Sequence, residues 1–337
     1  MRSDKRPAAV TMADVAARAG VSRALVSIVF RGVPGASPET RQRVMEAAEQ
    51  LSYRPDQRAR LLGSNRSRTV GVVFGLHHEF HAEVVEALYG AAEATGYDLA
   101  LGAAAPTRDE ERAVQSLLDY RCEALILIGP TLPRTAIEEL AERLPVVVVA
   151  RALRTRAADV VRTDDFSGAR LAVEHLSGLG HRAIVHVDGR RAPGAAERRR
   201  GYRAAMQALG LESSAVVIPG GLTEEDGERA AAELLAGTQP TAVTAFNDHC
   251  ASGLLAAARV CGVSVPDGLS VVGYDDSHVA GLSSVALTTI AQDATRLAGS
   301  ALELAVRRVV DGSDAPPCSE VVVPPRLVVR RTTAPVG

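Results

Sequence analysis

Residues 11–32 have the sequence TMADVAARAGVSRALVSIVFRG, which predicts two short helices joined by a tight turn. Thr11 can cap the first helix together with Asp14, and Gly20 can end it. Ser22 can cap the second helix. Apolar side chains recur at helical spacing on the facing sides of both helices, at Val15, Ala16, Ala19, Val26, Val29 and Phe30. The stretch therefore predicts a helix-turn-helix.

The second helix has an outer face that is not expected to pack against the first helix. Arg23, Ala24, Ser27 and Ile28 lie on this face near the helix N-terminus, and a helix of this length fits the major groove of DNA with such residues against the bases. The alternative is a small surface hairpin of helices without a partner. A third helix, predicted from the Ser-Pro-Glu start at 37–39 to about residue 51, completes an all-α domain over residues 11–54.

Charge is divided unequally along the chain. Residues 1–68 contain 13 Arg and Lys against 6 Asp and Glu, whereas the remainder contains 25 against 34. A basic segment on an acidic body is the electrostatic pattern expected of a nucleic-acid-binding module carried by a second, non-binding module. Lys5 is the only lysine, so the basic contacts must come from arginines, which suit bidentate pairing to phosphate or guanine.

Two segments flank the predicted helical domain. Residues 1–10 are expected to form a flexible N-terminal tail. Residues 55–68 are expected to form a hinge helix and linker, because the short helical pattern 56–62 is followed by Gly63 and a polar run.

From Thr69 onward, apolar strands alternate with amphipathic helices. Continuous apolar runs such as 146–149 are typical of parallel strands covered on both faces, so this rhythm predicts doubly wound α/β sheets. Two successive sets of strands and helices predict two lobes, and a late helix and strand return the chain to the first lobe. We assign lobe 1 to about 69–163 and 292–323, and lobe 2 to about 164–291 and 324–331.

Polar residues follow several predicted strands of lobe 2. Asn247 and Asp275 come directly after strands, and Arg198 enters the helix after another strand. Ligands of doubly wound sheets bind at the carboxyl ends of the strands, so a cleft between the lobes is expected there. A guanidinium, an amide and a carboxylate together suit a ligand rich in hydroxyl groups. The alternative for Arg198 and Asp275 is a mutual structural salt bridge.

Several motifs together resemble the lactose/galactose-repressor family of ligand-responsive bacterial transcription factors. Beyond the helix-turn-helix, the intervals match at Thr163-Asp164-Asp165, Asn247-Asp248, Gly273-Tyr274-Asp275-Asp276, Leu287-Thr288-Thr289 and Leu327-Val328-Val329-Arg330. The resemblance covers nearly the whole chain. It implies a small all-α helix-turn-helix DNA-binding domain followed by a two-lobed α/β domain like periplasmic binding proteins, with effector binding and dimerisation in residues 69–331.

The resemblance also implies which residues contact DNA. Ile28 stands where the family often has arginine, and Arg31 where it often has asparagine, so the operator sequence stays open. Leu62 matches a leucine that wedges into the minor groove; the alternative is that it only covers the junction with the effector domain. The candidate DNA-binding residues are Thr11, Ser22, Arg23, Ala24, Ser27, Ile28, Arg31, Arg58, Ala59 and Leu62.

For the effector site, the resemblance implies hydrogen bonds from Arg198, Asn247 and Asp275, with Asp164 at the lobe crossing. Arg151 follows a strand where the family often has an acidic residue before the arginine, whereas here Ala150 precedes it. The aromatic candidates could stack on a sugar or belong to the core. The candidate effector-binding residues are Phe74, His78, Phe80, Arg151, Asp164, Arg198, Phe246, Asn247 and Asp275.

Other functions find little support in the sequence. His77, His78, Glu79 and His81 are expected in a loop, without the helical pairing of imidazoles that binds zinc, so we expect a pocket rim and no metal. No nucleophile has a partnered base, and no cofactor motif is present, so neither catalysis nor a cofactor is expected.

The N-terminus lacks a hydrophobic signal core, and the longest apolar run is too short to span a bilayer, which predicts a cytoplasmic protein without membrane contact. The expected partners are a double-stranded DNA operator, a sugar-like effector and a second copy of the chain, in a homodimer or higher oligomer. The rival interpretation is a sugar-processing enzyme or solute-binding protein fused to a DNA-binding domain.

Overall fold

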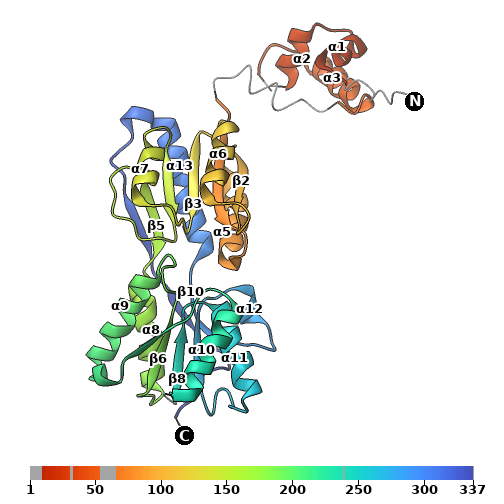
Figure 1. Ribbon diagram of the computed structural model, residues 1–337. Coiled ribbons are helices and arrows are strands. Elements are labelled where there is room, and N and C mark those ends of the chain that lie inside the picture. The colour runs from red at the N-terminus through yellow and green to blue at the C-terminus, as the bar shows by residue number, and fades with distance from the viewer. Residues whose placement is uncertain (1–9, 31–32, 54–65, 238–239, 337) are drawn as a thin grey trace, which may run out of the picture. The chain divides into compact units, whose positions relative to one another are not determined.

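The computed structural model describes residues 10–30, 33–53, 66–237 and 240–336 (Figure 1). The chain divides into two compact units, Met1–Ser67 and Arg68–Gly337. The predicted hinge helix 56–62 and nearly all of the predicted tail lie outside the described residues.

The first unit contains the helices α1 (Met12–Ala19), α2 (Arg23–Phe30) and α3 (Pro38–Gln50). The predicted cap of α1 is confirmed: the Thr11 hydroxyl donates to Asp14 Oδ2 at 2.7 Å, and the Asp14 N–H donates back to Thr11 Oγ1. Gly20 ends α1 with a left-handed φ of 64°, which glycine adopts without steric cost. Ser22 Oγ accepts from the Leu25 N–H and so caps α2. These local signals fix the angle at which α2 leaves the turn.

Lobe 1 is built on a parallel sheet in the order β11-β5-β4-β3-β1-β2. Its elements are β1 (Thr69–Gly75), α5 (Glu79–Glu93), β2 (Asp98–Ala104), α6 (Glu110–Asp119), β3 (Ala124–Ile128), α7 (Arg134–Ala141), β4 (Val146–Val149), β5 (Asp159–Thr163), α13 (Ala294–Asp311) and β11 (Glu320–Val323).

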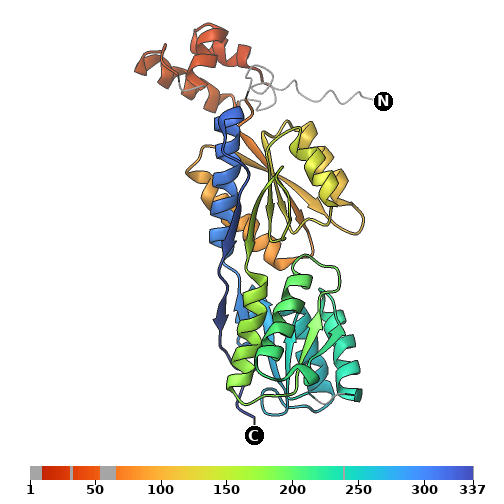
Figure 2. The same cartoon turned by 90° about the vertical axis from the view of Figure 1, so that its left-hand side faces the viewer.

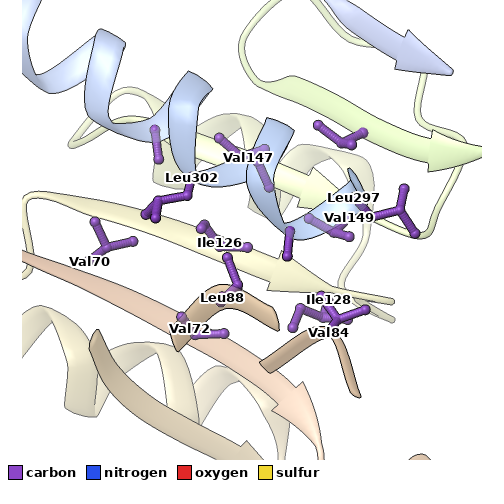
Figure 3. Close-up of a cluster of buried hydrophobic side chains, with 14 of the residues drawn as sticks. Val70, Val72, Val84, Leu88, Ile126, Ile128, Val147, Val149, Leu297 and Leu302 are labelled. Atoms are coloured by element: carbon purple, nitrogen blue, oxygen red, sulfur yellow. The ribbon is translucent and has the colours of Figure 1, made fainter. Parts of the chain in front are cut away.

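The core of lobe 1 lies between the sheet and helices α5 and α13. Figure 3 shows Leu88 of α5 and Leu302 of α13 over strand residues such as Ile126, all fully or almost fully buried. Each such side chain contributes roughly 1.5–3 kcal/mol by leaving water. Helices α6 and α7 cover the opposite face of the sheet. Burial on both faces explains the continuous apolar strands.

Lobe 2 has a sheet in the order β12-β10-β9-β8-β6-β7, parallel except for β12, which pairs antiparallel with β10. Helices α8 and α9 cover one face, and α10 and α11 cover the other. Its elements are α8 (Asp165–Gly178), β6 (Ile184–Asp188), α9 (Ala195–Ala208), β7 (Val216–Pro219), α10 (Glu224–Gly237), β8 (Ala242–Ala245), α11 (Asp248–Val260), β9 (Ser270–Asp275), α12 (His278–Gly281), β10 (Thr288–Ala291) and β12 (Arg326–Val328), with short 3-10 turns at Glu212–Ser214 and Gly312–Asp314.

The chain passes between the lobes after β5, after β10 and after β11. Figure 2 shows the last crossing, in blue, running along the edge of both lobes. The predicted fold class, a helix-turn-helix followed by a two-lobed α/β unit with largely parallel sheets, is confirmed.

Three strands were not predicted, because they lack the apolar pattern. β5 begins with Asp159, which is buried and accepts hydrogen bonds from Arg308 at 2.7 and 3.0 Å. β10 begins with two buried threonines, Thr288 and Thr289, and β12 spans only Arg326–Val328. Their polar side chains find partners only in the folded lobe, so a hydrophobic pattern cannot predict them.

Candidate functional site

A cavity of about 430 Å³ lies between the two lobes. Lobe 1 lines it with the loops after β1, β3 and β4, and lobe 2 with the loops after β6, β7, β8, β9 and β10. The carboxyl ends of both sheets therefore open into the same space, which is where doubly wound sheets bind ligands.

Arg198 is the most buried cation that lines the cavity, with 6% of its surface exposed. Its Nε donates to Asp165 Oδ1 at 2.8 Å and its Nη1 to the Phe246 carbonyl at 2.6 Å. The guanidinium also stacks on the Tyr274 ring, 3.5 Å from the centroid. Burial alone would lower the pKa of Arg198, but the carboxylates of Asp165 and Asp275 outweigh it, so the pKa lies above its usual value. Arg198 is thus a fixed cation at the cavity wall.

Asp275 faces Arg198 but is not its main partner. Its Oδ1 lies 3.8 Å from Arg198 Nη2, whereas Asp165 is 1 Å closer to this arginine. Gln292 Nε2 donates to Asp275 Oδ1 at 2.8 Å. Burial raises the pKa of Asp275 to about 6, although Arg198 and Gln292 oppose this shift. The remaining lone pairs of Asp275 can accept hydrogen bonds from a ligand.

Asn247 is oriented by two hydrogen bonds. Its Oδ1 accepts from the Cys250 N–H at 2.8 Å, which makes Asn247 the N-cap of α11, and its Nδ2 donates to the Leu222 carbonyl at 3.0 Å. The structure starts α11 (Asp248–Val260) directly after this cap, because the cap satisfies the first turn of the helix. The amide keeps one N–H and one lone pair for a ligand.

The histidine segment of lobe 1 belongs to the cavity wall. His77, His78, Glu79 and His81 all line the cavity. Expecting all four in a loop was wrong, since α5 begins at Glu79 with His78 as its N-cap. Burial, with a smaller effect of His78, lowers the pKa of His81 to about 3, and its Nδ1 accepts from the Gly75 N–H at 3.0 Å. His81 is therefore a neutral ring with its proton on Nε2.

Glu79 and Glu83 of lobe 1 each contact lobe 2, and the contact of Glu79 lies at the cavity. Glu79 of lobe 1 pairs with His249 of lobe 2 at 3.1 Å. The His278 N–H donates to Glu83 Oε1, also at 3.1 Å. Burial raises the pKa of Glu83 to about 7, with further increases from Glu79, Asp275 and Asp276, while the His278 hydrogen bond lowers it. Protonation at this junction therefore affects how the lobes meet.

Two parts of the chain match models of known protein families, and nearly the whole chain is similar to known transcriptional regulators. Residues 11–56 match the model of bacterial regulatory proteins of the lacI family, and residues 173–333 match a periplasmic binding protein-like domain. The transcriptional regulator GalR of Escherichia coli (strain K12) is 34% identical over 327 residues, covering 95% of this chain and 94% of GalR. The chain belongs to the lacI family.

Solved structures agree with membership of the lacI family. A LacI transcriptional regulator from Rhodococcus species is 47% identical, with a TM-score of 0.77 over 80% of this chain and 99% of that one. The lac repressor dimer bound to operator and the anti-inducer ONPF is 28% identical, with a TM-score of 0.84 over 97% and 99%. The regulator CelR in complex with cellobiose is 29% identical, with a TM-score of 0.72 over 97% and 100%.

In this lacI-family chain, the structure brings most of the predicted effector residues together. The residues that line the cavity are His78, Phe80, Arg198, Phe246, Asn247 and Asp275. Phe74 instead packs against the core of lobe 1, and Arg151 donates to the carbonyls of Pro130 and Leu132. Asp164 caps α8 through the Ser167 N–H and borders a different cavity. These three predicted residues do not line the interlobe cavity.

Several cavity residues were not predicted. Arg190 and Arg191 follow β6, which the sequence predicts, so the rule that found Asn247 and Asp275 could have found them. Gln292 follows β10, which was not predicted. No pattern in the sequence indicated the contact of His249, because its neighbour Glu79 lies in the other lobe.

The helix-turn-helix contains six of the predicted DNA-binding residues in the described part of the chain. Arg23 and Ala24 are exposed on α2, while Ser27 and Ile28 are half-buried. Thr11 and Ser22 are exposed caps of α1 and α2. Arg31, Arg58, Ala59 and Leu62 lie outside the described residues. Among the described helices, none combines the length and the apolar character that a membrane span requires.

Proposed function

We propose that this chain is an effector-controlled transcriptional repressor that binds a near-palindromic DNA operator as a homodimer. The lac repressor relative is a dimer on its operator, and CelR was solved with cellobiose. Its operator affinity would change when a sugar-like effector occupies the interlobe cavity. In this assignment residues 11–54 form the DNA-binding domain, 55–68 the hinge, and 69–331 the effector and dimerisation domain.

The observation that carries this proposal is the set of polar groups on the lobe 2 side of the cavity. Arg198 is a fixed donor, Asn247 keeps both a donor and an acceptor, and Asp275 is an acceptor. Adjacent hydroxyl groups of a sugar each donate and accept, so they match these groups without leaving a buried polar atom unpaired. Lobe 1 closes the cavity from the opposite side with His78 and Phe80.

In the DNA-binding domain, the exposed face of α2 would enter the major groove. Arg23, Ala24, Ser27 and Ile28 would meet base edges there. Thr11, Ser22 and Arg31 would contact the DNA around them. From the hinge, Leu62 would wedge into the minor groove with Arg58 and Ala59 beside it, kinking the operator so that it engages more protein surface.

Coupling between the two sites would come from closure of the lobes. An effector that touches both lobes would favour one arrangement of them. That arrangement would set the relative position of the two hinges in a dimer. Coupling free energies of roughly 1–3 kcal/mol suffice for such control.

Asp275→Asn tests the proposed effector site. An operator would first be selected from random duplex DNA with the full chain, and an effector found by thermal-shift screening of sugars, where a ligand at 100-fold its dissociation constant adds about 2.7 kcal/mol. The variant should lose a charged acceptor, weakening effector affinity roughly 10-fold to 100-fold, because such hydrogen bonds contribute about 1.5–3 kcal/mol. Operator affinity without effector should stay unchanged.

Asp267→Asn is the matched control, since Asp267 is an exposed carboxylate of the same lobe that does not line the cavity. It should bind effector as the unmodified chain does. Failure to select an inverted-repeat operator would reject the DNA-binding proposal, and a normal effector response in Asp275→Asn would reject the site.

A further inference from the structure

Two arginines line the cavity without a carboxylate partner among the described residues. Arg190 and Arg191 line it from the loop between β6 and α9, and both are exposed. Within the described ranges 10–30, 33–53, 66–237 and 240–336, neither forms a salt bridge. Two adjacent unpaired cations in a ligand cavity attract an anion.

A hydrogen bond from its side chain holds Arg190 in place. Its Nε donates to the Gly220 carbonyl at 2.8 Å, and Gly220 also lines the cavity. This bond leaves the two terminal nitrogens of the guanidinium for a ligand, in the fork that matches an oxyanion. The Arg190 backbone has a φ of 58°, a left-handed conformation that glycine adopts more easily. An arginine thus occupies a backbone position that favours glycine.

The carboxylates around the cavity do not neutralise these arginines. Asp226 accepts from the N–H groups of Leu222 and Thr223 and pairs with Arg229. Although partial burial raises the pKa of Asp226, these hydrogen bonds and Arg229 bring it below its usual value, so Asp226 is ionised and already paired.

The other two carboxylates of the cavity are also engaged. Glu79 Oε2 lies 3.1 Å from His249 Nε2, and Asp275 faces Arg198 and accepts from Gln292. The carboxylates that line the cavity therefore do not neutralise the positive charge of Arg190 and Arg191 in the loop between β6 and α9. The loop also leads into α9, whose N-cap Gly194 offers no capping side chain, and the partial positive charge of that helix terminus acts in the same direction.

We propose that the effector is a small polyol that carries an oxyanion, a phosphate or a carboxylate, and that Arg190 and Arg191 bind this group while Arg198, Asn247 and Asp275 bind its hydroxyls. This inference rests on the proposed function of the cavity as the effector site. A neutral ligand would leave both guanidinium groups unpaired as the lobes close around it, whereas an oxyanion pairs with them.

The test compares neutral sugars with their anionic derivatives at constant ionic strength. Calorimetry on the full chain would use glucose with glucose 6-phosphate and gluconate, ribose with ribose 5-phosphate, and inorganic phosphate alone. Anionic members should bind at least 10-fold more tightly than the neutral sugar, and inorganic phosphate should bind saturably. Tighter binding of the phosphate esters identifies a phosphate, and tighter binding of the sugar acid identifies a carboxylate.

Variants then assign the binding to the two arginines. The double variant Arg190→Gln/Arg191→Gln should lose inorganic phosphate binding and weaken the anionic sugars 10-fold to 100-fold, while leaving neutral sugars unaffected. Arg203→Gln is the control, since Arg203 is an exposed arginine on α9 that does not line the cavity. It should behave as the unmodified chain.

Two results overturn the inference. One is the absence of saturable phosphate binding to the unmodified chain, and the other is equal affinity for the neutral and anionic members of each pair, unchanged in the double variant. If operator binding still responds to a neutral sugar, the proposed function stands and only the oxyanion assignment fails. If no small molecule changes operator binding, the proposed function fails as well.

Discussion

Arg198 organises the lobe 2 side of the cavity as a single residue. Its guanidinium reaches Asp165, the Phe246 carbonyl and Asp275, and it stacks on the Tyr274 ring. Planar geometry allows these contacts together, which a lysine ammonium on a flexible stem cannot reproduce. The same side chain therefore stabilises lobe 2 and presents a donor to a ligand.

Replacing Arg198 with lysine should lower the free energy of unfolding. We expect a loss of roughly 1–3 kcal/mol, because at least one buried acceptor among the partners of Arg198 loses its donor. Urea denaturation of the full chain, followed by circular dichroism, measures this loss.

Arg170→Lys is the matched control. Arg170 pairs with Glu174 on the surface of α8, with both side chains more than 40% exposed, and exposed pairs one helical turn apart contribute about 0.3–0.5 kcal/mol. Equal losses in the two variants would contradict a special role for the Arg198 network.

The helix α2 is the element on which operator recognition depends. Its caps and the left-handed Gly20 set its direction, and Val26 and Val29 bury its inner side against α1 and α3. Arg23 and Ala24 stay exposed as a result. The position of the exposed face thus follows from local capping and a short apolar pattern.

Arg23→Ala should change which base pairs are preferred in the operator. A bidentate arginine–guanine pair contributes about 1–3 kcal/mol of discrimination, so preference at one position of each half-site should weaken. Selection of bound sequences from random DNA, with sequencing, measures the preference. Arg43→Ala, which removes an exposed arginine from α3, should leave the selected sequence unchanged; an unaltered sequence with Arg23→Ala would mean that α2 is docked differently.

One contact between the two lobes of the molecule includes a carboxylate that titrates, Glu83. Glu83 of lobe 1 accepts from the His278 N–H of lobe 2, and its pKa is about 7 there, compared with 4.5 for an ordinary glutamate. The junction therefore binds a proton between these pH values that separated lobes would release. By linkage, contact between the lobes is favoured below this window and weakens as the pH rises through it.

We predict that the lobes separate more readily as the pH rises from about 5 to 8, and that Glu83→Gln reduces this dependence. Small-angle scattering would show the separation as an increase in the radius of gyration. Glu86→Gln, an exposed change on the same helix, serves as control. An identical pH profile for Glu83→Gln and the unmodified chain would contradict the prediction.

The sequence by itself determined the elements whose causes are local. The capping box of Thr11 and Asp14, the turn at Gly20 and the apolar runs of β3 and β4 need only neighbouring residues, so their positions followed from spacing and residue type. The polar residues Asn247 and Asp275 could also be placed, because parallel strands bring their carboxyl ends to one edge of the sheet.

Only the tertiary structure decided which side chains face one another across the cavity. β5 and β10 are strands because buried polar residues such as Asp159 and Thr289 find partners far along the chain. Arg151 follows a predicted strand and Asp164 was expected at the lobe crossing, but both form hydrogen bonds with residues outside the cavity, whereas His249 lines the cavity although no sequence pattern predicted it. Long-range pairing sets the free energy of a buried polar group, and spacing along a sequence does not record it.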